Sequence, residues 1–120
     1  MAFPEETMKW MLNTNGASNK NRVGIGVVLE NSSEFLIEEA IWLEKDLANN
    51  EVEYEALIYG LELATNLETQ HLEVNLDSEL VFGHLIGTFE AKDSWMKQYC
   101  DKAQMIISQF QNLKVRALKR

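Results

Sequence analysis

The chain has 120 residues, 46% of them hydrophobic and 25% charged, which is the composition of a single globular domain with one hydrophobic core. Its 19 acidic residues outnumber its 11 basic ones and give a net charge of −8, so any binding of nucleic acid must be local or mediated by a metal. No apolar run approaches the ~18 residues of a membrane span, so we expect no membrane partner. The N-terminal MAFPEETMK lacks the apolar core of a secretory signal, and the single Cys100 cannot form an internal disulfide. We therefore expect an intracellular protein.

The first third of the chain predicts three strands in succession. Residues 1–8 are predicted to be a leader, and the domain is expected to run from residue 9 to residue 120. Hydrophobic alternation and polar turn residues give, in order, strand Lys9–Asn15, turn Gly16–Arg22, strand Val23–Glu30, turn Asn31–Ser33 and strand Phe35–Leu43. Three strands joined by short turns predict an antiparallel meander.

The period then becomes helical between Asn50 and about Leu67. Asn49 or Asn50 is the expected N-cap, and acidic residues in the first turn suit the helix dipole. The apolar positions fall on one stripe of an amphipathic helix, formed by Tyr54, Leu57, Ile58, Leu61 and Ala64.

The second half alternates strands and helices. His71–Leu76 is predicted to be a strand, and Ser78 is expected to cap a short helix that stops at Gly87. A long helix beginning at Asp93–Ser94 carries the stripe Met96, Tyr99, Ala103, Ile106 and Phe110. Leu113–Leu118 alternates like a last strand. The order β-β-β-α-β-α-α-β predicts an α/β fold with a mixed five-stranded sheet and helices packed on it, because a strand–helix–strand passage needs a parallel crossover.

Three polar side chains are predicted to converge where strands of this sheet end. The first strand ends at Asn15, the fourth at Asp77, and Glu53 lies on the helix stripe that faces the sheet. Clustered carboxylates bind Mg²⁺, and two such ions can drive phosphodiester cleavage. The structural alternatives are a dipole-complementing role for Glu53 and a helix-capping role for Asp77, and spacing alone favours these.

Several segments, in order and in register, resemble the RNase H family. The resemblance is carried by Asn13–Asn19 (NTNGASN), Asn49–Leu57 (NNEVEYEAL) and Val74–Val81 (VNLDSELV), with support from Gly24–Glu30 (GIGVVLE), Phe35–Ala40 (FLIEEA) and Gly87–Asp93 (GTFEAKD). It runs from about Trp10 to Arg120 and is most similar to the RNase H-like domains of plant retrotransposon polyproteins and their solitary relatives.

The resemblance implies a site that binds two Mg²⁺ ions and hydrolyses the RNA strand of RNA–DNA hybrids. It assigns metal binding and catalysis to Glu53 and to Asp77, with Glu79 where Gln is usual. It also implies that Asn49, Asn50 and Ser18 contact the nucleic acid. Mn²⁺ is an alternative to Mg²⁺.

Two departures from the family pattern predict an impaired enzyme. Asn15 replaces the first metal-binding Asp of a TDG-type motif, and a neutral amide bridges two metals poorly. The last Asp and a helper His belong to a segment that would follow Arg120; His71 and His84 are expected to be surface residues that do not replace it. Without the family's final helix, we expect an uncovered sheet that lowers stability or promotes self-association. The alternatives are a non-catalytic module that binds nucleic acid or protein, and a retroelement-derived vestige.

Overall fold

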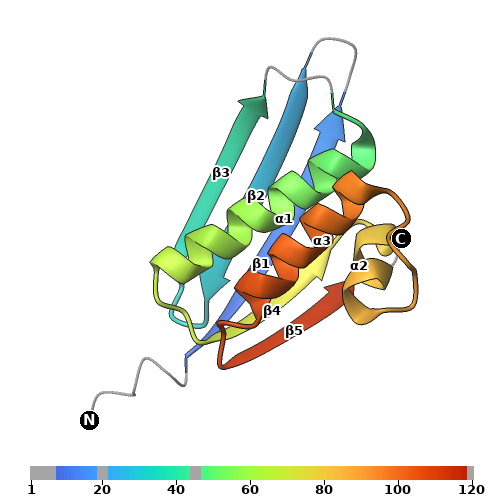
Figure 1. The fold of residues 1–120 in the computed structure, drawn as a ribbon. Coiled ribbons are helices and arrows are strands. Elements are labelled where there is room, and N and C mark those ends of the chain that lie inside the picture. Colours follow the sequence, from blue (N-terminus) through green and yellow to red (C-terminus); the bar gives the residue numbers. More distant parts are fainter. Residues whose placement is uncertain (1–7, 19–21, 44–46, 119–120) are drawn as a thin grey trace.

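The computed structural model describes residues 8–18, 22–43 and 47–118 of the chain, with the predicted order of strands and helices (Figure 1). The strands are β1 (Lys9–Ser18), β2 (Val23–Asn31), β3 (Leu36–Leu43), β4 (His71–Leu76) and β5 (Asn112–Ala117), and the helices are α1 (Asn49–Asn66), α2 (Glu79–Ile86) and α3 (Ser94–Ile107). Within the described residues, none of these helices has both the length and the apolar character needed to cross a membrane. The proposed leader, residues 1–8, lies outside the described residues except for Met8.

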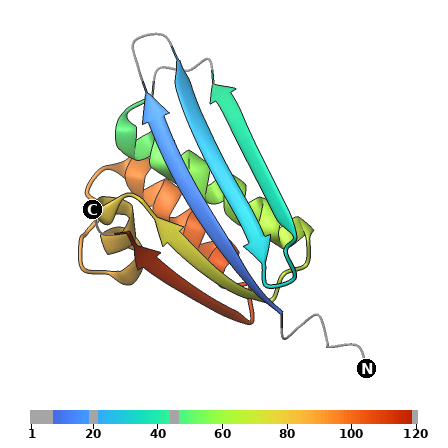
Figure 2. The ribbon, with the colours of Figure 1, turned by 180° about the vertical axis from the view of Figure 1, so that it is seen from behind.

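The strands form one mixed sheet in the order β3-β2-β1-β4-β5. β2 pairs antiparallel with β1 and with β3, whereas β4 pairs parallel with β1 and with β5. α1 and α3 cross one face of this sheet, and the view from behind shows the strands of the other face in front of the helices (Figure 2). The predicted fold class is therefore confirmed, and the second face, which we call the open face, has no described helix on it.

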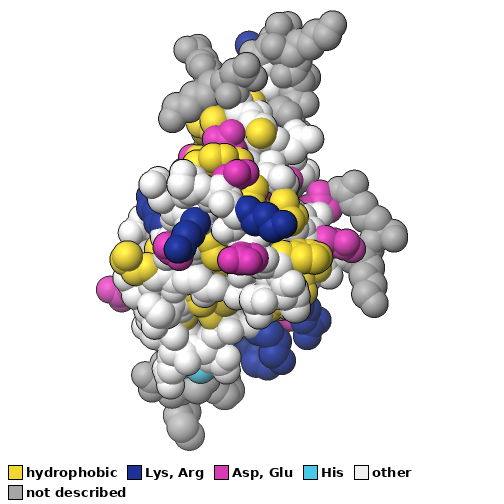
Figure 3. Space-filling model, turned by 45° about the vertical axis from the view of Figure 1, so that its right-hand side comes forward, with side chains coloured by type: hydrophobic (Ala, Val, Ile, Leu, Met, Phe, Trp, Pro, Cys, Tyr) yellow, Lys and Arg dark blue, Asp and Glu magenta, His cyan; other side chains and the backbone are white. Residues whose placement is uncertain are grey.

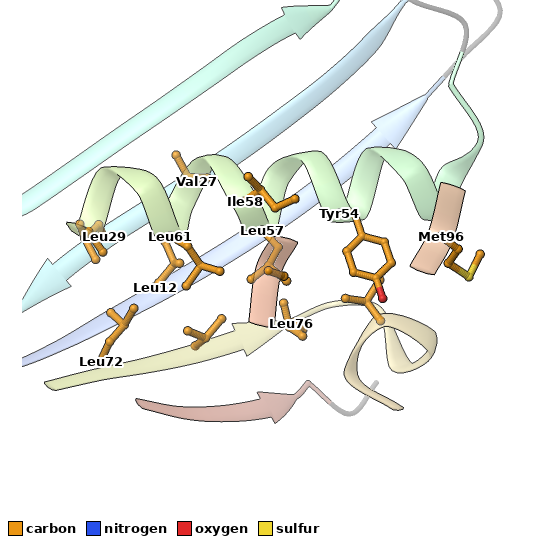
Figure 4. Close-up of a cluster of buried hydrophobic side chains, with 14 residues drawn as sticks. Leu12, Val27, Leu29, Tyr54, Leu57, Ile58, Leu61, Leu72, Leu76 and Met96 are labelled. Atoms are coloured by element: carbon orange, nitrogen blue, oxygen red, sulfur yellow. The ribbon is translucent and has the colours of Figure 1, made fainter. Parts of the chain in front are cut away.

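The core lies between the sheet and the two long helices. Most inward positions of β1, β2 and β4 are buried, and they meet the predicted stripe of α1, all of which is buried (Figure 4). Leu12, Leu57 and Leu61 have no exposed surface at all. Burial of a Leu side chain stabilises a fold by roughly 1.5–3 kcal/mol, so this layer fixes α1 against β1 and β4.

Some predicted boundaries were wrong. β1 continues to Ser18, because the residues expected to form a turn after Asn15 pair instead with Val23–Ile25 of β2. The N-cap of α1 is Ala48, not Asn49 or Asn50, and the Glu51 side chain accepts the Ala48 N–H over 3.3 Å in place of an Asn cap. Pairing with β2 thus keeps residues 16–18 in a strand despite their preference for turns. At the start of α1, the Glu51 side chain takes the capping role that was expected of an asparagine.

The predictions for the second half agree closely with the structure. β4 spans His71–Leu76 as predicted, and α2 starts after Ser78, whose Oγ accepts the Val81 N–H over 3.2 Å. Gly87 ends α2 with a φ of 86°, the left-handed conformation that favours glycine at this position. Asp77 therefore directly precedes Ser78, the N-cap of α2, which ties that residue to a fixed helix terminus.

Candidate active site at the ends of β1 and β4

Asn15 and Asp77 occupy equivalent positions on two neighbouring parallel strands. The pairing of β1 with β4 ends at Thr14 and Leu76, and Asn15 and Asp77 each follow by one residue. Adjacent strands lie about 4.8 Å apart, so these two residues stand side by side at one edge of the open face. Both line a shallow groove of about 590 Å³, which we call the Asn15–Asp77 groove. Its other lining residues are Asn13, Thr14, Gly26, Val27, Val28, Glu38, Glu39, Ala40 and Leu118.

Glu53 reaches the same region from α1. Its Oε1 accepts a hydrogen bond of 3.1 Å from the backbone N–H of Gly16, the residue that follows Asn15. This approach requires glycine, because a Cβ on Gly16 would lie 2.6 Å from Val52 Cγ1 and 3.1 Å from the Val52 carbonyl carbon. The contact places the Glu53 carboxylate beside the residue that follows Asn15, with Gly16 as the point at which α1 meets β1.

The predicted nucleic-acid contacts lie at the start of α1 and at the end of β1. Asn49 and Asn50 are the first residues of α1, where the N-terminal amides of the helix carry a partial positive charge. Asn49 is exposed and Asn50 is partly buried. Ser18 is the last residue of β1, and its side chain lies outside the described residues.

The donor set is small for a metal centre. Among the side chains that the structure describes, no group of three or more His, Cys, Asp and Glu residues is arranged to hold a metal ion. Glu53 and Asp77 supply two carboxylates, and Asn15 adds a neutral amide oxygen. Hard cations such as Mg²⁺ accept all three types of oxygen, but two divalent ions bring four positive charges to two negative ones.

Comparison with known proteins assigns the chain to a family. Residues 13–120 match the family described as reverse transcriptase-like. The chain belongs to this family. Among curated proteins, no sequence match was found.

The chain is also similar to solved structures of RNase H1 proteins and RNase H domains. RNase H1 from the halophilic archaeon Halobacterium salinarum NRC-1 superposes with a TM-score of 0.85 at 25% identity, covering 93% of this chain and 86% of that one. The N-terminal RNase H domain of Rv2228c from Mycobacterium tuberculosis, solved as a fusion with maltose-binding protein, gives 0.84 at 27% identity, with 93% and 88% covered. LC11-RNase H1 in complex with RNA/DNA hybrid gives 0.81 at 27% identity, with 92% and 86% covered. The predicted RNase H resemblance is confirmed; its plant retrotransposon origin stays a prediction.

In this RNase H-like domain, the prediction that His84 is a surface residue was wrong. His84 is 6% exposed, and its Nδ1 lies 2.8 Å from the hydroxyl of Tyr54, which is fully buried. The Tyr54 ring stacks between His84 and Tyr99, at centroid distances of 6.0 and 5.5 Å. α2 is apolar over most of its length, and this composition is the signal that a histidine within it would point into the core.

This buried contact connects the two helices that adjoin the candidate site. Tyr54 follows Glu53 on α1, and His84 lies on α2, which starts after Asp77. Burial lowers the pKa of His84 and raises that of Tyr54, so both side chains are held neutral. Cys100 packs partly buried against the same core, and burial raises the pKa of its thiol. His71, at the start of β4, is partly exposed.

Proposed function

We propose that this domain binds RNA–DNA hybrid at the Asn15–Asp77 groove and is weak or inactive as a ribonuclease. The observation that carries the proposal is the register of β1 and β4, which sets Asn15 beside Asp77 in a fold similar to RNase H1. A relative with 27% identity was solved in complex with RNA/DNA hybrid, which supports this class of ligand.

The donor chemistry supports impaired catalysis. Glu53, Asp77 and the Asn15 amide oxygen fit one hard cation, Mg²⁺ or Mn²⁺, held weakly. They do not fit a pair of ions, because the neutral amide of Asn15 neither bridges two metals well nor offsets their charge. This donor set therefore does not support two-metal cleavage of a phosphodiester.

Cleavage is tested with end-labelled RNA–DNA hybrid in Mg²⁺ and, separately, in Mn²⁺. We expect no cleavage, or cleavage far slower than that of an RNase H1 measured in parallel. The control is Asp77→Asn, which removes one of the two carboxylates and keeps the shape of the side chain. Efficient cleavage that Asp77→Asn abolishes would show that two carboxylates suffice and would overturn the proposed impairment.

Binding is tested by filter titration at low salt with RNA–DNA hybrid, duplex DNA and duplex RNA. We expect the hybrid to bind more tightly than either duplex. Salt must be held constant across the three, because phosphate contacts make every affinity salt-dependent. Absence of binding to all three would refute the proposed nucleic-acid function and favour the alternatives of a protein-binding module or a retroelement-derived vestige.

A further inference from the structure

The open face of the sheet carries a second groove, at the opposite end of β1 and β4 from Asn15 and Asp77. It has a volume of about 170 Å³, and we call it the basic groove. Its charged lining side chains are Lys9 from β1, Glu73 from β4, and Lys114 and Arg116 from β5, with His71 between them. Three cations thus face one carboxylate in a chain whose net charge is −8.

The strand register links the two grooves. On the open face, paired residues of β1, β4 and β5 form rows that run across the three strands. In order along the strands, the rows are Lys9, His71 and Asn112; Met11, Glu73 and Lys114; and Asn13, Asn75 and Arg116. Asn15 and Asp77 follow Asn13 and Asn75 by two residues, about 6.6 Å along the strands. Asn13 lines the Asn15–Asp77 groove and Arg116 lines the basic groove, so their shared row is the boundary between them.

The basic side chains stay accessible to a ligand. Arg116 donates through Nε to Glu73 Oε1 over 2.7 Å, yet 61% of its side chain is exposed. A guanidinium has five N–H donors, so this ion pair orients Arg116 and leaves further donors directed outward. In the view from the side of α2 and β5, basic side chains stand side by side at the lower right (Figure 3).

We propose that Lys9, Lys114 and Arg116 form a phosphate-binding track that holds the backbone of a nucleic-acid strand on its way to the Asn15–Asp77 groove. The proposal rests on the proposed function and names the surface that would supply its affinity. Charge complementarity selects the occupant: Lys114 and Arg116, two residues apart on β5, together with Lys9 on β1, suit a polyanion with regularly spaced charges. The net charge of −8 repels the same polyanion, so the cations of the track supply the local attraction that the rest of the chain lacks.

The test compares two double variants by fluorescence anisotropy with labelled RNA–DNA hybrid. Lys114→Gln/Arg116→Gln removes two cations of the track. Lys97→Gln/Lys102→Gln removes two cations of α3, where Lys102 also forms an ion pair, at 3.8 Å from Glu62. We expect the track variant to bind on the order of tenfold more weakly at low salt, with a slope of log K against log salt smaller by about 2. The α3 variant should bind within about twofold of the wild type.

Further arms distinguish the outcomes. Lys9→Gln/Lys114→Gln leaves the Arg116–Glu73 pair intact and should show the same loss, which separates lost phosphate contacts from a disturbed ion pair.

Hybrid binding that the track and α3 variants weaken equally would overturn the track and leave the proposed function standing. Binding of duplex DNA but not hybrid, lost only in the track variants, would uphold the track and refute the proposed function. Binding of labelled polyglutamate in preference to either nucleic acid would overturn the choice of occupant, and no binding by the wild type would overturn both proposals.

Discussion

Gly16 and Glu53 are 37 residues apart in sequence, and the Gly16 N–H donates a hydrogen bond of 3.1 Å to Glu53 Oε1. This contact closes α1 onto β1 directly beside Asn15. It gives Glu53 a structural role whether or not it ever binds a metal, because its carboxylate satisfies a backbone donor where strand and helix meet. The glycine and the acid of the two sequence motifs are therefore one structural unit.

Gly16→Ala should destabilise the domain by roughly 1–3 kcal/mol, the usual cost of overpacking. The new Cβ would meet Val52 Cγ1 at 2.6 Å and backbone atoms of α1 at 3.1 and 3.2 Å, so the helix would have to move away from β1. Urea unfolding followed by circular dichroism measures the change in free energy of unfolding. Gly26→Ala is the matched control, because there the Cβ meets only the Asn15 carbonyl oxygen, at 4.0 Å. Equal losses in the two variants would refute the close-approach explanation.

The fold could be predicted from the sequence because the pattern of buried residues has a clear period in each element. Leu72, Val74 and Leu76 alternate in β4, and Leu57 and Leu61 share a face of α1; all five are buried as expected. The length of β1 could not be predicted in the same way. Gly16–Ser18 favour a turn locally, and only pairing with β2, which depends on tertiary structure, keeps them in the sheet.

For the candidate site, the sequence predicted the neighbours but not the contacts. Asn15 and Asp77 stand side by side because both follow parallel strands, a relationship that the order of elements already implies. The hydrogen bond between Glu53 and Gly16 needs the actual helix–strand distance. His84 was misassigned for a related reason: a polar residue in a short apolar helix is buried only if a partner such as Tyr54 is present, and that partner lies on another helix.

Tyr54→Phe should lower the free energy of unfolding by about 1–3 kcal/mol, the cost of leaving a buried polar atom without its partner. The substitution keeps the ring and its stacking on Tyr99 but removes the hydroxyl that lies 2.8 Å from His84 Nδ1. Tyr59→Phe is the matched control. Tyr59 donates a hydrogen bond to Glu39 at a contact that is only partly buried, so water can replace the lost hydroxyl there. A loss in Tyr59→Phe as large as that in Tyr54→Phe would contradict the assignment of a buried, water-free contact between α1 and α2.

The stability of the domain should fall as the pH drops below about 6.5, the ordinary pKa of histidine. Burial lowers the pKa of His84 in the folded state, so between that lowered value and about 6.5 the unfolded chain binds more protons than the folded one. The contribution of His84 is therefore fully present above this window and is lost as the pH falls through it. His84→Gln keeps an acceptor for Tyr54 but does not titrate. Urea midpoints between pH 5 and 8 should decline less steeply for this variant than for the wild type, and parallel curves would exclude His84 as the source.

Asn15→Asp should convert the site into a tighter binder of divalent cations. The new carboxylate would stand beside Asp77 at the end of the neighbouring strand, so the two negative charges should repel in EDTA and lower the melting temperature. Mn²⁺ should reverse this loss, because a cation that binds only the folded state stabilises it. Titration calorimetry should show Mn²⁺ affinity increased roughly tenfold or more, since a nearby unit charge contributes on the order of several kcal/mol even in a partly screened site.

The matched control for this variant is Asn13→Asp, which adds the same charge to the same groove two residues earlier on β1. It should gain little Mn²⁺ affinity, because it is displaced by about 6.6 Å along the strand from the row of Asp77. Hybrid cleavage in Mn²⁺ that appears in Asn15→Asp and not in Asn13→Asp would identify the amide at position 15 as the cause of the impairment. Tighter Mn²⁺ binding without cleavage would mean that the missing charge at position 15 weakens metal binding but is not the only cause of impaired cleavage. The site would then lack a further group that cleavage needs.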